Sequence, residues 1–169
     1  MANKETLIKI FEYALNQEKT GLTFFRQSLD RLGIGAAVTA FKRLVREEEG
    51  HITFISGILD DIRKGDEISM DQLKQVTIEP TDYFDQRAKS EFLEQCLYGS
   101  MVPDVTVFSI AWLIEKDLSE FYAKMAEKTD GKAKDALTLL ASWEKEHERF
   151  FREYRDTLAK VYAEMPWGG

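Results

Sequence analysis

The stretch "LASWEKEHERFF", Leu140 to Phe151, places a glutamate three residues before a histidine, at Glu144 and His147. Residues at i and i+3 share one face of a helix, so a carboxylate oxygen and an imidazole nitrogen can reach the same ion. Leucine, alanine and phenylalanine recur around this pair at three- and four-residue spacing, which predicts a helix with the pair on its apolar face. The stretch is therefore either a metal-binding pair or a charged surface run that contains a histidine.

The same pattern occurs earlier in the chain. The stretch "LVREEEGHITFI", from Leu44, aligns with the first one and places Glu48 and His51 opposite Glu144 and His147, at an offset of 96 residues (144 − 48). These are the only two histidines in the sequence. Because both carry a glutamate at i−3 in equivalent places, a chance coincidence is a poor explanation.

A second pair of stretches repeats in the same way. "ALNQEKTGLTFFRQSL" aligns with "AWLIEKDLSEFYAKMA", which pairs Glu18 with Glu115 at an offset of 97 residues (115 − 18) and Phe25 with Tyr122. The two halves of the chain therefore use one helical pattern twice.

Turn signals divide the apolar periodicity into four long helices. We expect them at residues 4–32, 35–64, 104–129 and 133–163. Short connections make each successive pair an antiparallel hairpin, and a crossover at about 65–103, with a short extra helix near 81–99, joins the hairpins. The predicted fold is all-α: one domain over residues 1–169, a ferritin-like four-helix bundle of two antiparallel hairpins joined by a long crossover.

The four repeated glutamates each interrupt the apolar stripe of their helix. At about 1.5 Å per residue, the lengths from each glutamate to the hairpin turn bring all of them to one level of the bundle. Burying an unpaired carboxylate costs several kcal/mol, and four together repel one another. Two divalent cations would resolve that conflict. The predicted metal ligands are Glu18, Glu48, His51, Glu115, Glu144 and His147.

Composition limits the partners. The net charge is −7, and no cluster of lysine and arginine forms a basic stripe, so we expect no nucleic-acid partner. The most apolar segment, residues 105–114, is too short to span a bilayer, so we expect no membrane insertion. The single Cys96 and a first segment unlike a signal peptide predict a cytoplasmic protein.

With these motifs, the sequence resembles the ferritin-like di-iron carboxylate superfamily, and most closely its rubrerythrin-type members. The resemblance covers all four predicted helices in the order Glu, ExxH, Glu, ExxH. It implies that Glu48 and Glu144 bridge two iron ions and that Glu18 and Glu115 are terminal ligands, with one histidine at each metal. Manganese or zinc would also fit these ligands. In such proteins a phenol at the place of Tyr122 often hydrogen-bonds to a ligand.

Two departures from that family matter. Rubrerythrins proper carry a rubredoxin-like iron site with two CxxC pairs, whereas this sequence has one cysteine, so we expect a separate electron donor. They also place an extra carboxylate one turn from the third-helix glutamate, where this sequence has Trp112 and Leu118.

The resemblance implies an oxidoreductase that reacts with hydrogen peroxide or O2, with a homodimer expected by analogy. A ferroxidase for iron storage or detoxification is the alternative, and a non-catalytic helical adaptor is the third. For the six predicted ligands, the competing interpretations are a core network of hydrogen-bonded polar groups and solvated charge on the flank of each helix. The sequence leaves two roles open for Tyr122, contact with a ligand and ordinary packing in the core. The neighbouring glutamates are expected to face solvent: Glu47, Glu49, Glu146 and Glu148.

Overall fold

Four long helices make up most of the structure. The computed structural model describes residues 2–30, 36–70 and 105–164. The helices are α1 (Lys4–Leu29), α2 (Ala36–Lys64), α4 (Val105–Ala126) and α5 (Gly131–Glu164). Each lies within a few residues of its predicted range.

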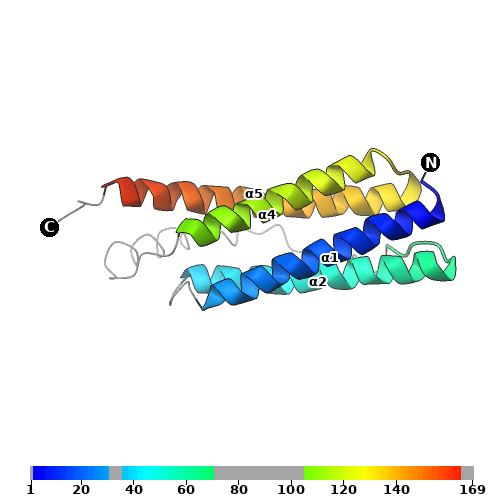
Figure 1. Cartoon of the computed structure of the whole chain (residues 1–169), viewed down its shortest axis with the longest axis horizontal. Coiled ribbons are helices and arrows are strands. Elements are labelled where there is room, and N and C mark those ends of the chain that lie inside the picture. The colour runs from blue at the N-terminus through cyan, green and yellow to red at the C-terminus, as the bar shows by residue number, and fades with distance from the viewer. Residues whose placement is uncertain (1, 31–35, 71–104, 165–169) are drawn as a thin grey trace.

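The helices form two antiparallel hairpins that lie side by side along their length (Figure 1). Helix α1 packs mainly against α2, and α4 packs mainly against α5, with further contact between α1 and α4. The prediction of an all-α, ferritin-like bundle built from two hairpins is therefore confirmed. The predicted extra helix at 81–99, most of the crossover and Cys96 lie outside the described residues. No helix in the described part of the chain is both long enough and apolar enough to cross a membrane.

Local sequence explains where several helices begin and end. The side chain of Asn3 accepts a hydrogen bond from the backbone N–H of Thr6 at 2.8 Å, which caps the start of α1. Helix α2 stops before Gly65, whose φ of 81° is readily adopted only by glycine. After α4, the hydroxyl of Thr129 donates to the carbonyl of Met125 at 3.0 Å, so a side chain satisfies an end carbonyl.

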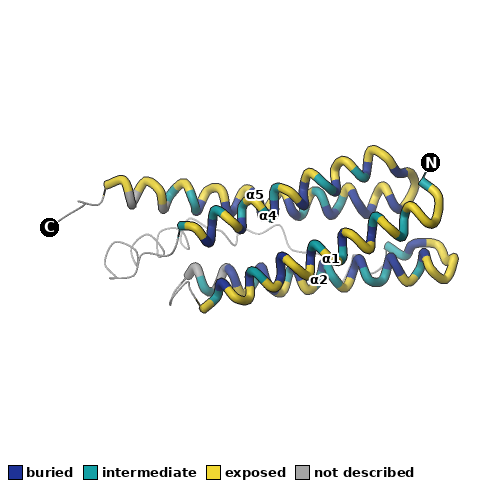
Figure 2. The backbone as a smooth tube through the Cα atoms, viewed as in Figure 1, coloured by how far each residue is buried: buried dark blue, intermediate teal, exposed yellow. Residues whose placement is uncertain are grey.

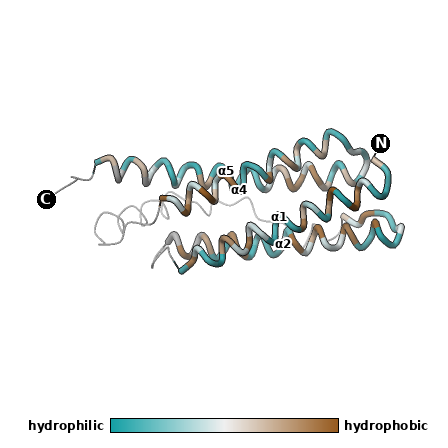
Figure 3. Tube along the Cα trace, in the orientation of Figure 1, coloured by the Kyte–Doolittle hydropathy of each residue, from teal (hydrophilic) through white to brown (hydrophobic). Residues whose placement is uncertain are grey.

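The inner faces of the helices are buried and apolar, and the outer faces are exposed and polar (Figures 2 and 3). The buried apolar residues form two clusters. We call the first the aromatic cluster; it contains Leu22, Phe25, Phe41, Leu44, Val45, Val107, Phe108, Ala111, Phe150, Phe151 and Tyr154.

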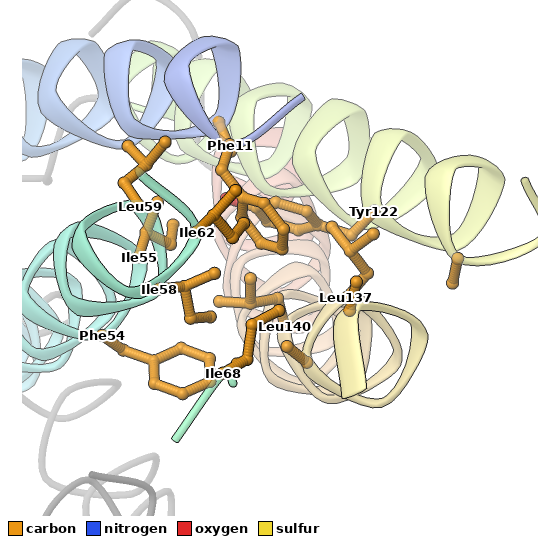
Figure 4. Close-up of a cluster of buried hydrophobic side chains, with 14 of the residues drawn as sticks. Phe11, Phe54, Ile55, Ile58, Leu59, Ile62, Ile68, Tyr122, Leu137 and Leu140 are labelled. Atoms are coloured by element: carbon orange, nitrogen blue, oxygen red, sulfur yellow. The ribbon is translucent and has the colours of Figure 1, made fainter. Parts of the chain in front are cut away.

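We call the second the aliphatic cluster (Figure 4); it includes Phe11, Ile55, Ile58, Leu59, Ile62, Leu118, Tyr122, Leu137 and Leu140. Along α1 the aromatic cluster begins with Leu22 and the aliphatic cluster ends with Ala14, so Glu18 lies between them. The predicted ligands therefore occupy a polar layer between two apolar ones.

Candidate metal centre

The six predicted ligand side chains come together inside the bundle. Each helix contributes: α1 and α4 supply one glutamate each, and α2 and α5 supply one ExxH pair each. None of the six is more than 3% exposed to solvent. The alternative in which these charges lie on solvated helix flanks is therefore wrong.

Two overlapping groups of ligand atoms can each hold an ion. One consists of Glu18, Glu48, His51 and Glu144, and the other of Glu48, Glu115, Glu144 and His147. Within each group the atoms lie within 4.8 Å of one another. Both groups contain Glu48 and Glu144, so these two carboxylates occupy the position that a bridge between two metals requires.

Each histidine points its Nδ1 atom into the centre. His51 Nδ1 lies 2.7 Å from Glu144 Oε1, 3.4 Å from Glu48 Oε2 and 3.9 Å from Glu18 Oε2. The second histidine repeats this geometry at 2.9 Å from Glu48 Oε1 and 3.3 Å from Glu144 Oε2. Its Nδ1 is 3.6 Å from the third carboxylate, Glu115. The Nδ1 atom of each histidine thus lies closest to the shared glutamate of the opposite hairpin.

The electrostatics of the centre favour protons where no metal is bound. Burial by itself lowers the pKa of His51 and His147, but contact with the surrounding carboxylates outweighs burial and raises the pKa of each well above its usual range. Burial raises the pKa of Glu18 and Glu115, and the charges of the two shared glutamates raise it further. Without metal, the centre therefore favours the protonated forms of both histidines and of Glu18 and Glu115, which we call the outer carboxylates.

The shared glutamates behave in the opposite way. Burial raises the pKa of Glu48 and Glu144, but the charges and contacts of the two histidines outweigh this effect and lower it. The centre therefore favours the ionised form of these two carboxylates, which lie between the two imidazoles.

Whether these residues fit metal ions can be tested by asking whether their buried polar atoms already make hydrogen bonds. Buried polar atoms in proteins nearly always have a partner. Although the histidine Nδ1 atoms lie close to carboxylate oxygens, these contacts do not have the geometry of hydrogen bonds. Within the described residues, the buried atoms of the centre that make no hydrogen bond are Glu18 Oε2, Glu48 Oε1, His51 Nδ1 and Nε2, both oxygens of Glu115 and Glu144, and His147 Nδ1. Carboxylate oxygens and imidazole nitrogens of this kind are suitable donors for divalent transition metals, so the ligand set fits a pair of such ions.

Tyr122 both packs in the core and contacts a predicted ligand, which were the two possibilities that the sequence left open. Its ring is fully buried in the aliphatic cluster, and its hydroxyl donates a hydrogen bond to Glu18 Oε1. Burial raises the pKa of the phenol well above its usual range, and the charge of Glu18 raises it further. Tyr122 therefore keeps its proton and holds one outer carboxylate in place.

The expectation that all four neighbouring glutamates face solvent is wrong for two of them. Glu47 is half-buried, and its Oε2 lies 2.8 Å from Nε2 of His147. Glu148 is only 4% exposed. Glu49 and Glu146 are exposed, as predicted, with side-chain exposures of 46% and 62%.

Glu47 was misjudged because it lies one residue before Glu48, off the apolar stripe of its own helix. A helix-by-helix interpretation does not reveal that α5 covers this side. Burial raises the pKa of Glu47, but the bonds from His147 and Arg43 outweigh it and lower the pKa, so the carboxylate is ionised. The signal that could have found it is the need of a metal-ligating histidine for a partner at its outer nitrogen.

Trp143 is a second residue that the sequence interpretation missed. Its indole stacks on the ring of His51, with ring centres 4.9 Å apart and planes 9° from parallel. The two histidine rings also stack, at 5.5 Å and 19°. The signal was present in the repeat, because Trp143 occupies the place of Glu47 in the other half (143 − 47 = 96).

A pocket of about 350 Å³ lies between α1 and α4. Gln17 and Ile114, which directly precede Glu18 and Glu115, both line it. Further lining residues are Tyr13, Thr20, Gly21, Phe24, Asp117, Leu118 and Phe121. The positions one turn from Glu115 are Trp112 and Leu118, so the structure places no extra carboxylate there.

Comparison with known proteins agrees with this geometry. No curated protein and no solved structure gave a match. The family model described as rubrerythrin matches residues 9–155, which include all four helices and all six residues of the centre. With a match over most of its length and two buried Glu/His groups in the bundle core, the chain belongs to the rubrerythrin family.

Proposed function

We propose that this protein is a di-iron carboxylate oxidoreductase that reduces hydrogen peroxide. The observation that carries the proposal is the pair of ligand groups that share Glu48 and Glu144. Four carboxylates and two neutral imidazoles balance the charge of two divalent ions, which removes the repulsion among buried carboxylates. The same ligands accept manganese or zinc, and membership of the rubrerythrin family favours iron.

In this proposal each hairpin contributes a bridge and one ligand pair. Glu18 and His51 complete one metal position, and Glu115 and His147 complete the other. Glu48 and Glu144 bridge the two. The close approach of each histidine to the bridge of the opposite hairpin supports this division.

When bound, the iron pair would supply two electrons, one from each iron(II), to cleave the O–O bond of peroxide, and two protons complete its conversion to two water molecules. The protein's part is to hold the ligands, limit water and position protons. Tyr122 fixes Glu18 through its hydroxyl and retains its own proton. The pocket between α1 and α4 is lined by Gln17 and Ile114, the sequence neighbours of Glu18 and Glu115, and it is the entry that we propose for a small oxidant.

Reducing equivalents come from a separate donor in this proposal. The sequence contains one cysteine, whereas a rubredoxin-like iron site needs four. A donor protein or a small reductant would therefore return the iron to the reduced state after each turnover.

The test is anaerobic loading of purified protein with iron(II), followed by separate additions of hydrogen peroxide and O2. We expect two iron ions per chain and faster oxidation by peroxide than by O2. Glu144→Ala should lose both metal pairing and peroxide-dependent oxidation. Glu146→Ala is the matched control, because Glu146 lies two residues away on the same helix and is exposed.

Other outcomes would lead to different functions. Rapid turnover with O2 and formation of a mineral, in a large assembly on size-exclusion chromatography, would replace the proposal with iron storage. Failure to bind near-stoichiometric metal under iron-replete conditions would leave neither function and would favour a helical adaptor.

A further inference from the structure

The two halves of the centre have identical ligands but different surroundings. On the side of His147, the outer nitrogen Nε2 is bonded to Glu47 at 2.8 Å. Glu47 is in turn held by Arg43, whose Nε lies 2.9 Å from the other carboxylate oxygen. A carboxylate in this position fixes the ring orientation and increases the donor strength of the opposite nitrogen, here the inward-facing Nδ1.

On the side of His51, the equivalent residues are apolar. The offset of 96 places Leu139 where the other half has Arg43, and Trp143 where it has Glu47. Trp143 covers the face of the His51 ring, and Phe54 packs edge-on against the indole at 5.7 Å. Stacking fixes the plane of the imidazole, but it brings no negative charge to strengthen Nδ1 as a donor.

The outer carboxylates, Glu18 and Glu115, also differ in a way that favours metal binding on the side of His147. Glu18 accepts a hydrogen bond from Tyr122, which withdraws electron density from one of its oxygens. Both oxygens of Glu115 lack a hydrogen-bond partner within the described residues. The repeat has Phe25, which has no hydroxyl, in the place of Tyr122 (122 − 97 = 25). No hydrogen bond to another described residue therefore competes with a cation for the Glu115 carboxylate.

We propose that the two metal positions are inequivalent: the position completed by Glu115 and His147 takes a divalent cation first and more tightly than the position completed by Glu18 and His51. Glu47 is the positioning residue that creates the difference, through His147. The inference rests on the two-metal centre of the proposed function. Its consequence is that one metal is retained while the other exchanges.

The chain's two histidines make this order measurable without any activity. Metal-free protein labelled with ¹⁵N-histidine is titrated with Zn²⁺, which is diamagnetic, and two-bond ¹H–¹⁵N spectra follow the ring nitrogens. Proximity of ring protons to the Trp143 indole identifies the His51 signals. Below one equivalent of Zn²⁺, we expect Nδ1 of His147 to shift first and Nδ1 of His51 to shift only with the second equivalent.

Three variants separate positioning from general destabilisation. Glu47→Gln keeps the shape but removes the charge, and it should weaken the first binding event about 10- to 100-fold while the second changes little. Trp143→Glu places a carboxylate in the equivalent position, so the second event should strengthen towards the first. Glu49→Gln is the matched control, because Glu49 is an exposed carboxylate on the same helix, and it should change neither event.

The results distinguish this inference from the proposed function. If both histidines shift together, the inequivalence is wrong although the two-metal centre stands. If His51 shifts first, or if Glu47→Gln leaves the order and the first affinity unchanged, the proposed order and the role of Glu47 are wrong. If Zn²⁺ binds at neither histidine, the two-metal centre itself is wrong, and the inference falls with it.

Discussion

The α1–α2 and α4–α5 hairpins carry the same ligand pattern, yet they place it in different environments. Residues that would contact the metals are duplicated, whereas two positions around them are not: Glu47 corresponds to Trp143, and Phe25 to Tyr122. A metal ion at each position would need the same kinds of contacting side chain, so those residues are the same in both halves. The second set is free to differ, so it is where two similar metal positions can acquire different properties.

Substitution of a shared glutamate should have the largest effect on metal binding, because Glu48 and Glu144 each belong to both ligand groups. Glu48→Ala removes a carboxylate that belongs to both ligand groups, so we expect metal content to fall from two ions per chain to one or none. Glu144→Ala should do the same, and metal analysis of the purified variants measures it.

Glu49→Ala is the matched control for this comparison, since Glu49 is adjacent in sequence but half-exposed and paired with Arg26. Retention of two ions at unchanged affinity in Glu48→Ala would mean that this carboxylate is not a bridge.

The dependence of stability on pH tests a property that both halves have without metal, the raised pKa of their histidine and outer glutamate. The pKa of His51 and His147 is raised by folding, so their contribution to stability is present below about pH 6.5 and is lost as pH rises through the folded-state values. The raised pKa of Glu18 and Glu115 acts in the same direction from about pH 4.3 upward. Thermal unfolding of metal-free protein should therefore show a Tm that falls as the pH rises above about 6.5.

Metal binding should reverse that trend, because the ions require deprotonated ligands and bind more tightly as pH rises. A metal-free Tm that is constant or increases over the same range would contradict the proton-holding state of the centre.

Replacing Tyr122 by phenylalanine gives both halves the same residue at this place, because the first half has Phe25 there. Tyr122→Phe removes the hydroxyl that bonds Glu18 and leaves a buried carboxylate oxygen without its donor, which should cost about 1–3 kcal/mol in the free energy of unfolding. Denaturant unfolding of the metal-free protein measures this. The matched variant is Tyr154→Phe, which removes a hydroxyl from a buried tyrosine of the aromatic cluster, away from the ligands. Equal losses in both variants would show that the contact with Glu18 has no special value.

Gly21 should give the smallest effect. A Cβ at this position would lie 3.3 Å from Cγ2 of Ile114, a close contact between α1 and α4. Ile114 borders the pocket and can shift into it, so we expect Gly21→Ala to gain part of the helix preference of alanine, about 0.5 kcal/mol. Denaturant unfolding would measure the gain. A loss of stability would instead show that the two helices cannot move apart at this point.

The side chains that meet in the centre could be predicted from the sequence because their signal is local. A charged residue on an apolar helical stripe is visible within one helix, and the repeat confirmed the pattern at Glu48, His51, Glu144 and His147. Helix bounds followed from the same periodicity and from nearby turn residues. Glu47 and Trp143 could not be assigned in this way, because each acts on a histidine of the other hairpin. Their role depends on how α2 and α5 face one another, which no single helix encodes.

Helix packing within each hairpin is closer than packing between hairpins, where α1 and α4 leave a pocket. The shared carboxylates change this balance, since Glu48 belongs to one hairpin and Glu144 to the other, and each joins both ligand groups. A bound metal pair would act as a cross-link between two locally folded units, in the way that a disulfide joins two strands. Removal of the ions should therefore loosen docking of the hairpins before it unfolds either one, and hydrogen exchange should rise first along the facing sides of α1 and α4.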